Sequence, residues 1–291
     1  MTPWSVLRDG VRLIWRFVKD HPASFGLAVS GAAVFAGAII ASAWVIGLVT
    51  DSLIIPVLDE GVGPEGLIAP AAGAILVVSI IKAAGIVLRR TSAGWLQFRT
   101  RQDVRNRLLS HQLSLEMSWF SRQAVGDLLA VAESDVDQGT GVLAPLPYAT
   151  GVTLLLFGTT AMIALIDPWL GLGAVIGLIV VLVVDIRGSW ITYGLWEEVQ
   201  EARGEVSTVA HESFDGALTV KALGREDYVS DRFGHVSDKV RDRLIAVNST
   251  WASYQSVIRV LPQVMIICLL VIGVVRVDAG VVTPGDLVTV A

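Results

Sequence analysis

The chain has 291 residues, of which 53% are hydrophobic, and its formal net charge is −5. The apolar fraction exceeds that of a typical soluble domain, which argues against a soluble globular protein. The single cysteine, Cys268, excludes a disulfide framework and a cysteine metal cluster, and no basic patch with interleaved aromatic residues indicates a nucleic-acid partner.

The first 20 residues predict an amphipathic helix. Apolar residues recur at helical spacing, and a separate basic stripe runs beside them; the apolar positions are Trp4, Leu7, Val11, Ile14, Trp15 and Val18, and the basic ones Arg8, Arg12, Arg16 and Lys19. Such a helix lies in the plane of a membrane interface. We therefore predict an interfacial helix at residues 1–21 and no cleavable signal peptide.

Long apolar runs follow. Residues 22–50 contain no Asp, Glu, Lys or Arg. At 1.5 Å per residue this run exceeds the hydrocarbon core of about 30 Å. Further runs lie at residues 66–88, 139–166, 169–184 and 260–275, and residues 287–291 open another. The sequence thus predicts an all-α membrane protein with five spans and the start of a sixth.

The basic residues predict the orientation. All but one of the 22 Lys and Arg residues lie within residues 1–20, 82–122 and 187–259. The loops predicted on the opposite side carry Asp59, Glu60, Glu65, Asp167 and Asp278. Because cytoplasmic loops retain Lys and Arg, we expect the N-terminus in the cytoplasm. We expect a multi-pass protein of the inner or plasma membrane of a bacterial cell.

Two polar intervals predict helical hairpins that project from the membrane. The helical pattern of the second span continues to about Leu113, roughly 35 Å beyond the bilayer edge. Residues 114–138 reverse the chain, and a helix from Gly126 returns to the third span, with a local break between Gly139 and Pro147. The connection at Asp167-Pro168 is short, so the third and fourth spans are predicted to be antiparallel neighbours. The fourth and fifth spans extend likewise, joined by a short link at residues 212–225.

Nucleotide and metal motifs are absent from the sequence. No GxxxxGK[ST] occurs, and the chain has no Gly-Lys pair, so it is not expected to bind ATP through a phosphate-binding loop. The histidines, His21, His111, His211 and His235, are far apart in sequence. We expect no catalytic, cofactor-binding or metal-binding residue in this chain.

Three motifs resemble those of the membrane domain of ATP-binding cassette exporters, and the likeness covers nearly the whole chain. Residues 115–138 resemble the first intracellular loop of that family, through Trp119-Phe120, Gly126-Asp127-Leu128 and Ser134-Asp135-Val136-Asp137. Two stretches resemble the second intracellular loop of that family, namely Glu212-Ser213-Phe214-Asp215-Gly216 and Val220-Lys221-Ala222-Leu223-Gly224-Arg225-Glu226. Thr283-Pro284-Gly285-Asp286-Leu287 resembles the entry into the sixth span.

The resemblance implies a domain organisation. Residues 1–21 would be the amphipathic elbow helix, and residues 22–291 an exporter-type transmembrane domain that is incomplete at its sixth span. Family members continue into a cytoplasmic nucleotide-binding domain, which this chain lacks and which would hold ATP and Mg²⁺. A second transmembrane half, identical or different, would complete the transporter.

The resemblance also implies site residues. Each hairpin tip would form a coupling helix seated on a nucleotide-binding domain. Trp119 and Phe120, near Gly126, would be the plug of the first, although they could instead cap their own hairpin. Residues 212–223 would form the second, so the expected coupling residues there are Glu212, Gly216, Lys221 and Glu226.

Two charged residues inside the apolar spans are candidates for a substrate cavity. Lys82 lies well inside the second span and Asp185 at a similar depth in the fourth. Charged side chains at such depths generally face an aqueous cavity or a partner, so the two could pair. The alternative for Lys82 is that its ammonium group reaches the headgroups.

The predicted function is that of the membrane-spanning part of an ATP-driven exporter, whose intact form would be an ATP-hydrolysing translocase. ATP binding would close the nucleotide-binding domains, and the hairpins would convert that closure into alternating access for an unspecified substrate. One alternative is an ion-coupled secondary transporter, for which Asp185 is the candidate carboxylate. Another is a non-transporting membrane scaffold of the same fold.

Overall fold

The computed structural model describes residues 3–60, 65–120, 123 and 125–290. These residues form helices and turns, without a strand among them. Five segments are long and apolar enough to cross a membrane: Pro22–Leu58, Gly66–Leu113, Leu128–Ile166, Pro168–Asp215 and Glu226–Asp278. The predicted all-α class with five spans is therefore confirmed. Residues 61–64 of the predicted loop between the first and second spans lie outside the described residues.

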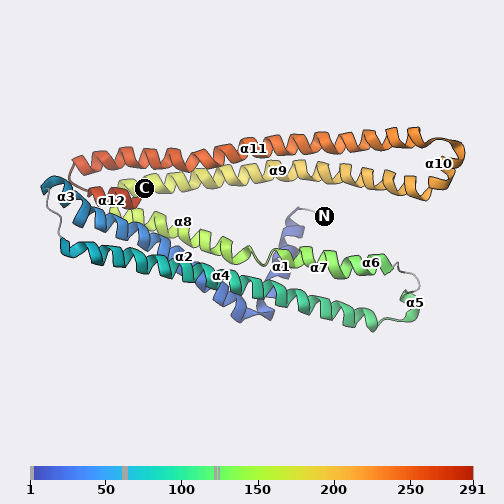
Figure 1. Ribbon diagram of the computed structural model, residues 1–291, viewed down its shortest axis with the longest axis horizontal. Coiled ribbons are helices and arrows are strands. Elements are labelled where there is room, and N and C mark those ends of the chain that lie inside the picture. The colour runs from blue at the N-terminus through green and yellow to red at the C-terminus, as the bar shows by residue number, and fades with distance from the viewer. Residues whose placement is uncertain (1–2, 61–64, 121–122, 124, 291) are drawn as a thin grey trace. The chain divides into compact units, whose positions relative to one another are not determined.

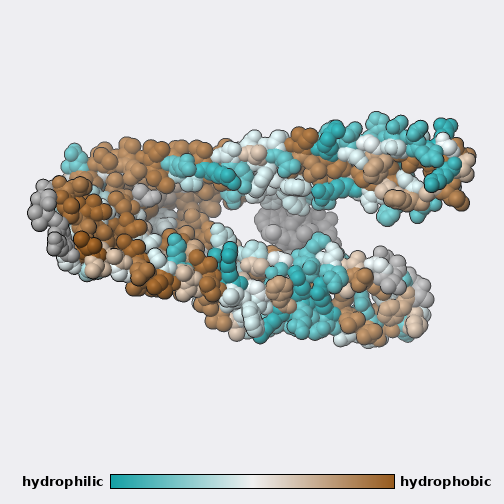
Figure 2. All heavy atoms as spheres, viewed as in Figure 1, coloured by the Kyte–Doolittle hydropathy of each residue, from teal (hydrophilic) through white to brown (hydrophobic). Residues whose placement is uncertain are grey.

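The chain divides into two compact units, which are described separately. The first comprises Met1–Gly171 and Gly273–Ala291, and the second comprises Leu172–Ile272. Each contains one long helical hairpin (Figure 1). Within each unit, apolar side chains gather on the part of the long helices away from the hairpin end, and polar side chains are more frequent along the hairpin arms (Figure 2).

The first unit is built on two closely packed helices, α2 (Pro22–Val49) and α4 (Glu65–Leu113). A Cβ atom added to Gly31 would lie 2.5 Å from the backbone nitrogen of Arg89, and one added to Gly85 would lie 2.9 Å from that of Phe35. Small residues allow such backbone approach in membrane helices. A π-helix, η1 (Thr50–Ile54), continues α2 into α3 (Ile55–Glu60).

A buried arginine marks the meeting of three helices in this unit. Arg89 of α4 is only 8% exposed. Its guanidinium carbon lies 5.0 Å from the ring centre of Phe35 in α2 and 4.8 Å from that of Tyr148 in α8 (Leu146–Ile166). Two aromatic faces therefore stabilise this buried cation, although its Nη1 atom is buried without a hydrogen-bond partner among the described residues.

The return arm of the first hairpin is segmented. It runs through α5 (Met117–Phe120), α6 (Val125–Ala130), the π-helix η2 (Val131–Asp135) and α7 (Val136–Gly141) before α8 begins at Leu146. The gap between α7 and α8 confirms the predicted break. Pro147 stands in the first turn of α8, where the missing N–H of proline costs no helical hydrogen bond.

The connection between the third and fourth spans is a single residue. Asp167 separates α8 from α9 (Pro168–Asp215), and its Oδ1 accepts hydrogen bonds from the backbone N–H groups of Trp169 and Leu170, at 2.9 and 3.1 Å. Its Oδ2 accepts from Arg276 Nε at 3.0 Å and Nη2 at 2.5 Å. The predicted short turn is thus confirmed, and it is tied to the far end of α11 (Glu226–Asp278).

The last helix of the first unit, α12 (Pro284–Val290), packs on α2 and η1. Asp51 accepts hydrogen bonds from Thr283 Oγ1 and from the backbone N–H of Gly285, both at 2.6 Å. Gly47 and Gly285 face each other so closely that a Cβ on Gly47 would lie 2.5 Å from the Gly285 carbonyl oxygen.

The second unit is a hairpin of α9 and α11 joined by the short helix α10 (Ala217–Leu223). The ring of Tyr254 fills the space left by Gly188, and its hydroxyl donates to the Val184 carbonyl at 2.8 Å. Farther along, ion pairs join the arms, namely Lys239 with Glu205 at 3.0 Å, Arg232 with Glu212 at 2.9 Å, and Arg243 with Glu198.

The link in the second hairpin differs from the sequence expectation. The coupling helix was expected at residues 212–223, but α9 continues through Glu212 to Asp215 and the separate helix begins at Ala217. The interruption is Gly216, whose φ of −86° and ψ of 4° depart from helical geometry. Glycine tolerates backbone conformations outside the helical range, so Gly216 can end α9 here. The polar character of the segment does not indicate this end point.

Candidate functional site: the hairpin tips and the arms behind them

The first tip carries the predicted aromatic pair. After α4 ends at Leu113, the chain turns into α5, where the rings of Trp119 and Phe120 meet edge to face with centroids 5.3 Å apart and an interplanar angle of 87°. Both side chains are half-buried, and Gly126 lies exposed in α6. The aromatic pair therefore offers a preformed apolar element at the end of the arm.

Two more apolar residues at this tip were missed from the sequence. Leu113 is 72% exposed and Met117 is 82% exposed. Both lie where the chain reverses, and exposed apolar groups gathered at one place typically mark an interaction surface. Periodicity assigned Leu113 to the apolar face of a helix and could not show that this face has no partner at the helix end.

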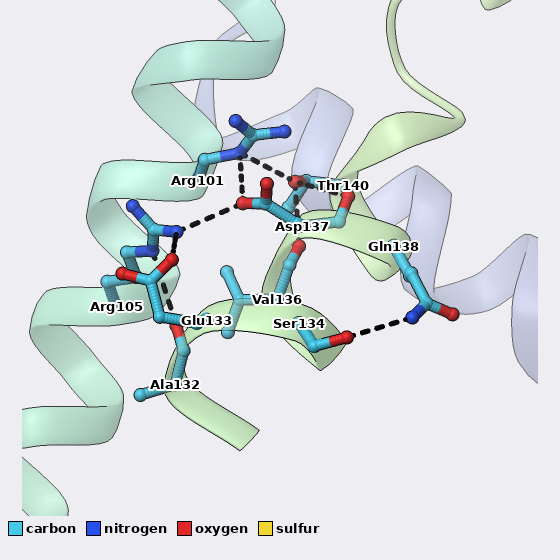
Figure 3. A network of polar contacts seen from close by, with 9 residues as sticks. All are labelled: Arg101, Arg105, Ala132, Glu133, Ser134, Val136, Asp137, Gln138 and Thr140. Atoms are coloured by element: carbon cyan, nitrogen blue, oxygen red, sulfur yellow. Dashed lines mark hydrogen bonds and ion pairs between the residues drawn. The ribbon is translucent and has the colours of Figure 1, made fainter. Parts of the chain in front are cut away.

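An ion-pair network joins the two arms behind the first tip (Figure 3). Arg101 Nε lies 3.0 Å from Asp137 Oδ1, and Arg105 Nη2 lies 3.0 Å from the same oxygen and 2.9 Å from Glu133 Oε2. Arg105 Nε also donates to the Ala132 carbonyl at 3.2 Å. Single exposed pairs contribute little, but a shared network holds α4 against η2 and α7 at several points. The arms are therefore braced to move together.

The amphipathic helix α1 (Pro3–Asp20) is attached to the same arm. Asp20 Oδ2 lies 2.8 Å from Arg107 Nη2, and this hydrogen bond lowers the pKa of Asp20. His21 Nε2 lies 3.0 Å from Asp103 Oδ2. Phe17 packs with Leu96 and Leu143 in a buried apolar cluster beneath α1.

The second tip is shaped by its glycines. Gly224 has a φ of +60° and ends α10, with the N–H of Arg225 donating to the Val220 carbonyl at 3.1 Å. This closes the helix in the way that left-handed glycine caps do. Lys221 is exposed on α10. Glu226 lies in the first turn of α11, where its negative charge interacts favourably with the positive end of the helix dipole.

Apolar side chains project from the second tip. Phe214 is 79% exposed, Leu218 is 85% exposed and Leu223 is 69% exposed. Glu212 lies just behind them, held by Arg232. The sequence placed Phe214 and Leu223 within the second motif and Leu218 between its two parts, without singling them out, because exposure at a hairpin end depends on where the helix breaks.

The two candidate cavity residues belong to different units. Lys82 is half-buried on α4 in the first unit and forms no ion pair within the described part of the chain. Asp185 lies exposed on α9 in the second unit and accepts a 3.4 Å hydrogen bond from the Tyr254 hydroxyl. Their pairing with each other stays a prediction.

Comparison with known proteins gives a consistent likeness. Residues 25–291 match the family described as the ABC transporter transmembrane region. The chain is 27% identical over 186 residues to the ATP-dependent lipid A-core flippase of Nitrosococcus oceani, covering 57% of this chain and 28% of that protein. It is 24% identical over 277 residues to the flippase of the same name from Haemophilus influenzae, covering 92% of this chain and 44% of that protein.

A third relative, the ATP-dependent lipid A-core flippase of Vibrio vulnificus, is 23% identical over 289 residues, covering 95% of this chain and 47% of that protein. The chain therefore spans less than half the length of these curated relatives.

Proposed function

Because this chain belongs to the family of ABC transporter transmembrane regions, we propose that it forms the substrate pathway of an ATP-driven exporter and couples that pathway to a nucleotide-binding domain. The observation that carries this proposal is the pair of hairpin tips. Each tip presents apolar side chains, Met117 at 82% exposure and Leu218 at 85%, on arms that turn polar beyond the apolar runs at residues 66–88 and 169–184. Exposed apolar side chains gathered in this way typically mark a surface that binds a partner.

The arms would transmit rigid-body motion. Apolar anchors seated in pockets of a partner resist displacement, and braced helices carry the displacement to the membrane segments. In the first hairpin the aromatic pair Trp119-Phe120 would anchor, with Gly126 leaving room beside it. In the second the anchor would be α10 with Phe214, flanked by Glu212, Gly216, Lys221 and Glu226. ATP and Mg²⁺ would bind to the partner domain.

The distribution of basic residues supports a cytoplasmic location of both tips and of the N-terminus. A second transmembrane half would complete the pathway, with Lys82 and Asp185 facing it.

The substrate we propose is an amphipathic, negatively charged lipid. Two considerations support this class. The relatives are named as flippases of a lipid A-core, and Lys82 is a half-buried cation within an apolar segment that has no ion pair in the part of the chain that the structure describes. A lipid anion could satisfy such a charge.

The test of this function uses the intact transporter reconstituted in vesicles. We expect transfer of a labelled anionic lipid between leaflets to require ATP hydrolysis and to stop with a non-hydrolysable ATP analogue. Transfer that continues without nucleotide but ends when the proton gradient is dissipated would establish an ion-coupled transporter instead. If the intact protein shows no lipid transfer and no lipid-stimulated ATPase activity, the result would support the alternative of a non-transporting scaffold.

Replacing Phe120 by alanine should uncouple transport from hydrolysis. The loss of one aromatic anchor is expected to reduce lipid transfer about fivefold or more relative to ATPase turnover, because a loosened tip no longer transmits the full displacement. The two rates are measured on the same vesicles. A matched control is Phe157→Ala, which removes a 62% exposed phenylalanine from α8, away from the tip and from the ion-pair network of the arms. Equal loss of transfer and hydrolysis in Phe120→Ala, with normal folding, would argue against the anchor role.

A further inference from the structure

A groove lies in the first unit between the amphipathic helix α1, the arm α4 and the return arm. Its volume is about 450 Å³. The three elements contribute apolar walls, made by Leu13, Phe17, Val104, Leu108, Val131 and Val136. None of the functions assigned to the tips uses this groove, which lies behind them beside the membrane-facing helix.

Open space continues along the side of α7. Gly139 lines the groove, and a Cβ atom added there would meet nothing within 4 Å. The groove is therefore wide enough at this point for an aliphatic chain to lie against the helix backbone.

The rim of the groove carries two unpaired charges of opposite sign. Arg16 projects from α1 and Asp135 from the end of η2, and both are exposed. Within the described residues, neither side chain forms a direct ion pair or a hydrogen bond, although the charge of Arg16 also acts on Asp20 at longer range. A third charge on the rim, Arg107, is already paired with Asp20 at 2.8 Å. The free groups are thus one guanidinium and one carboxylate, which together suit a zwitterion.

The position of the groove beside α1 indicates which kind of zwitterion could bind there. Helix α1 has an apolar face and a basic stripe and, under the membrane placement proposed above, lies at the level of the lipid headgroups. The first span begins at Pro22, and the preceding His21 lies 3.0 Å from Asp103 of α4. The headgroup level on α4 is therefore near Asp103, farther along the helix than the end of its apolar run at residue 88. A molecule there that has an aliphatic chain, an anionic phosphate and a cationic group is a phospholipid. An ammonium group with N–H donors can hydrogen-bond to Asp135, whereas a quaternary ammonium has no donor to offer.

We propose that this groove binds an aminophospholipid of the phosphatidylethanolamine type, with an acyl chain along Gly139, its phosphate at Arg16 and its ammonium group at Asp135. The bound lipid would bridge α1 to both arms of the first hairpin. It is a resident lipid, separate from the transported substrate, and the proposal rests on the membrane placement given under the proposed function.

The test measures lipid retention by native mass spectrometry on the intact transporter, delipidated and titrated with palmitoyl-oleoyl phosphatidylethanolamine, phosphatidylcholine or phosphatidylglycerol. Wild-type protein should retain phosphatidylethanolamine in preference to phosphatidylcholine. Arg16→Gln should weaken both phosphatidylethanolamine and phosphatidylglycerol about fivefold, because each loses its phosphate contact. Asp135→Asn should weaken phosphatidylethanolamine about fivefold while leaving phosphatidylglycerol unchanged or tighter.

Filling the groove gives an independent test. Gly139→Leu should reduce retention of phosphatidylethanolamine on the order of tenfold, because the new side chain displaces several buried methylene groups of the lipid. The matched control is Gly141→Leu, at another glycine of α7 with no atom within 4 Å of an added Cβ, which does not line the groove. Should Gly139→Leu fail to fold, the two rim variants decide the matter, since both alter exposed side chains.

Retention of phosphatidylethanolamine at wild-type strength in both Arg16→Gln and Asp135→Asn would overturn the proposal, as would equal retention of phosphatidylcholine by the wild type. The measurement needs neither ATP nor transport. A protein that transports lipid but shows no preference for phosphatidylethanolamine would therefore refute this inference alone, and one with the preference but no transport would refute only the proposed function.

Discussion

Replacing Arg276 by alanine is expected to lower the free energy of unfolding by about 3 kcal/mol. Arg276 is the partner of Asp167, whose side chain is 1% exposed, and its Nε and Nη2 atoms lie 3.0 and 2.5 Å from Asp167 Oδ2. Removing the arginine leaves a buried carboxylate without its cation. Only the two backbone N–H groups at Oδ1 would remain to stabilise that charge.

The loss should depend on pH in a defined direction. Burial is the largest influence and by itself raises the pKa of Asp167, but the hydrogen bonds from Arg276 and from the backbone N–H groups of Leu170 and Trp169 together outweigh it and leave the pKa lowered. A carboxyl group with a lowered pKa stabilises the fold fully above its unfolded pKa of about 3.9, and this stabilisation is lost as the pH falls through the folded pKa. Without Arg276 the pKa of the buried carboxyl rises, so the difference between wild type and Arg276→Ala should be largest at neutral pH, where Asp167 is ionised in both proteins, and should shrink as the pH falls and Asp167 becomes protonated in the variant.

Thermal and denaturant unfolding of the purified protein in detergent would measure this effect. A matched control is Arg241→Ala, which breaks ion pairs with Asp238 and Asp242 that are more than half exposed and should therefore cost much less than Arg276→Ala. Adding Asp167→Asn to Arg276→Ala should recover part of the loss, because no buried charge then remains. A loss in Arg276→Ala as small as that of the control would refute the structural role of this pair.

Replacing Gly31 by alanine is the second change with a large expected effect. The new Cβ would lie 2.5 Å from the backbone nitrogen and 3.0 Å from the Cα of Arg89. Backbone atoms of a helix cannot rotate aside, so α2 and α4 would have to separate. Overpacking of this kind costs about 1–3 kcal/mol. The separation would also disturb the stacking of Arg89 between Phe35 and Tyr148.

A second glycine of the same helix supplies the control. An added Cβ at Gly37 has no neighbour within 4 Å, so Gly37→Ala should be neutral or stabilise the protein by up to about 1 kcal/mol through helix propensity. Unfolding midpoints of the two variants and the wild type, measured under identical detergent conditions, would decide the prediction. Equal midpoints for Gly31→Ala and Gly37→Ala would show that the close approach of α2 and α4 does not limit stability.

Much of the architecture followed from local sequence. The spans were predictable because the transfer of apolar side chains into lipid depends on composition along a single helix, as residues 22–50 illustrate. The break before α8 was predictable from Gly139, Gly141, Pro145 and Pro147, and the one-residue turn from Asp167-Pro168, since both reflect the backbone chemistry of a few adjacent residues. The first tip was likewise located by its aromatic pair.

The site was only partly predictable. The sequence identified Trp119-Phe120 and the second motif, but it missed the exposed Met117 and Leu218 and extended the second coupling helix back to Glu212. Helical periodicity shows which face of a helix is apolar. It does not show where one glycine, here Gly216, separates two helices, and so it cannot show which side chains remain uncovered at the tip.

The sequence by itself determined the helices, the spans and the polar hairpins, because each depends on interactions within one segment. Only the tertiary structure decided which distant residues meet. Arg276 was the one basic residue outside the charged intervals, and it binds Asp167, 109 positions away in sequence. Arg101 and Arg105 likewise meet Asp137 across the hairpin. These pairings depend on the relative register and rotation of packed helices, which close contacts such as Gly31 against Arg89 fix and which no single segment encodes.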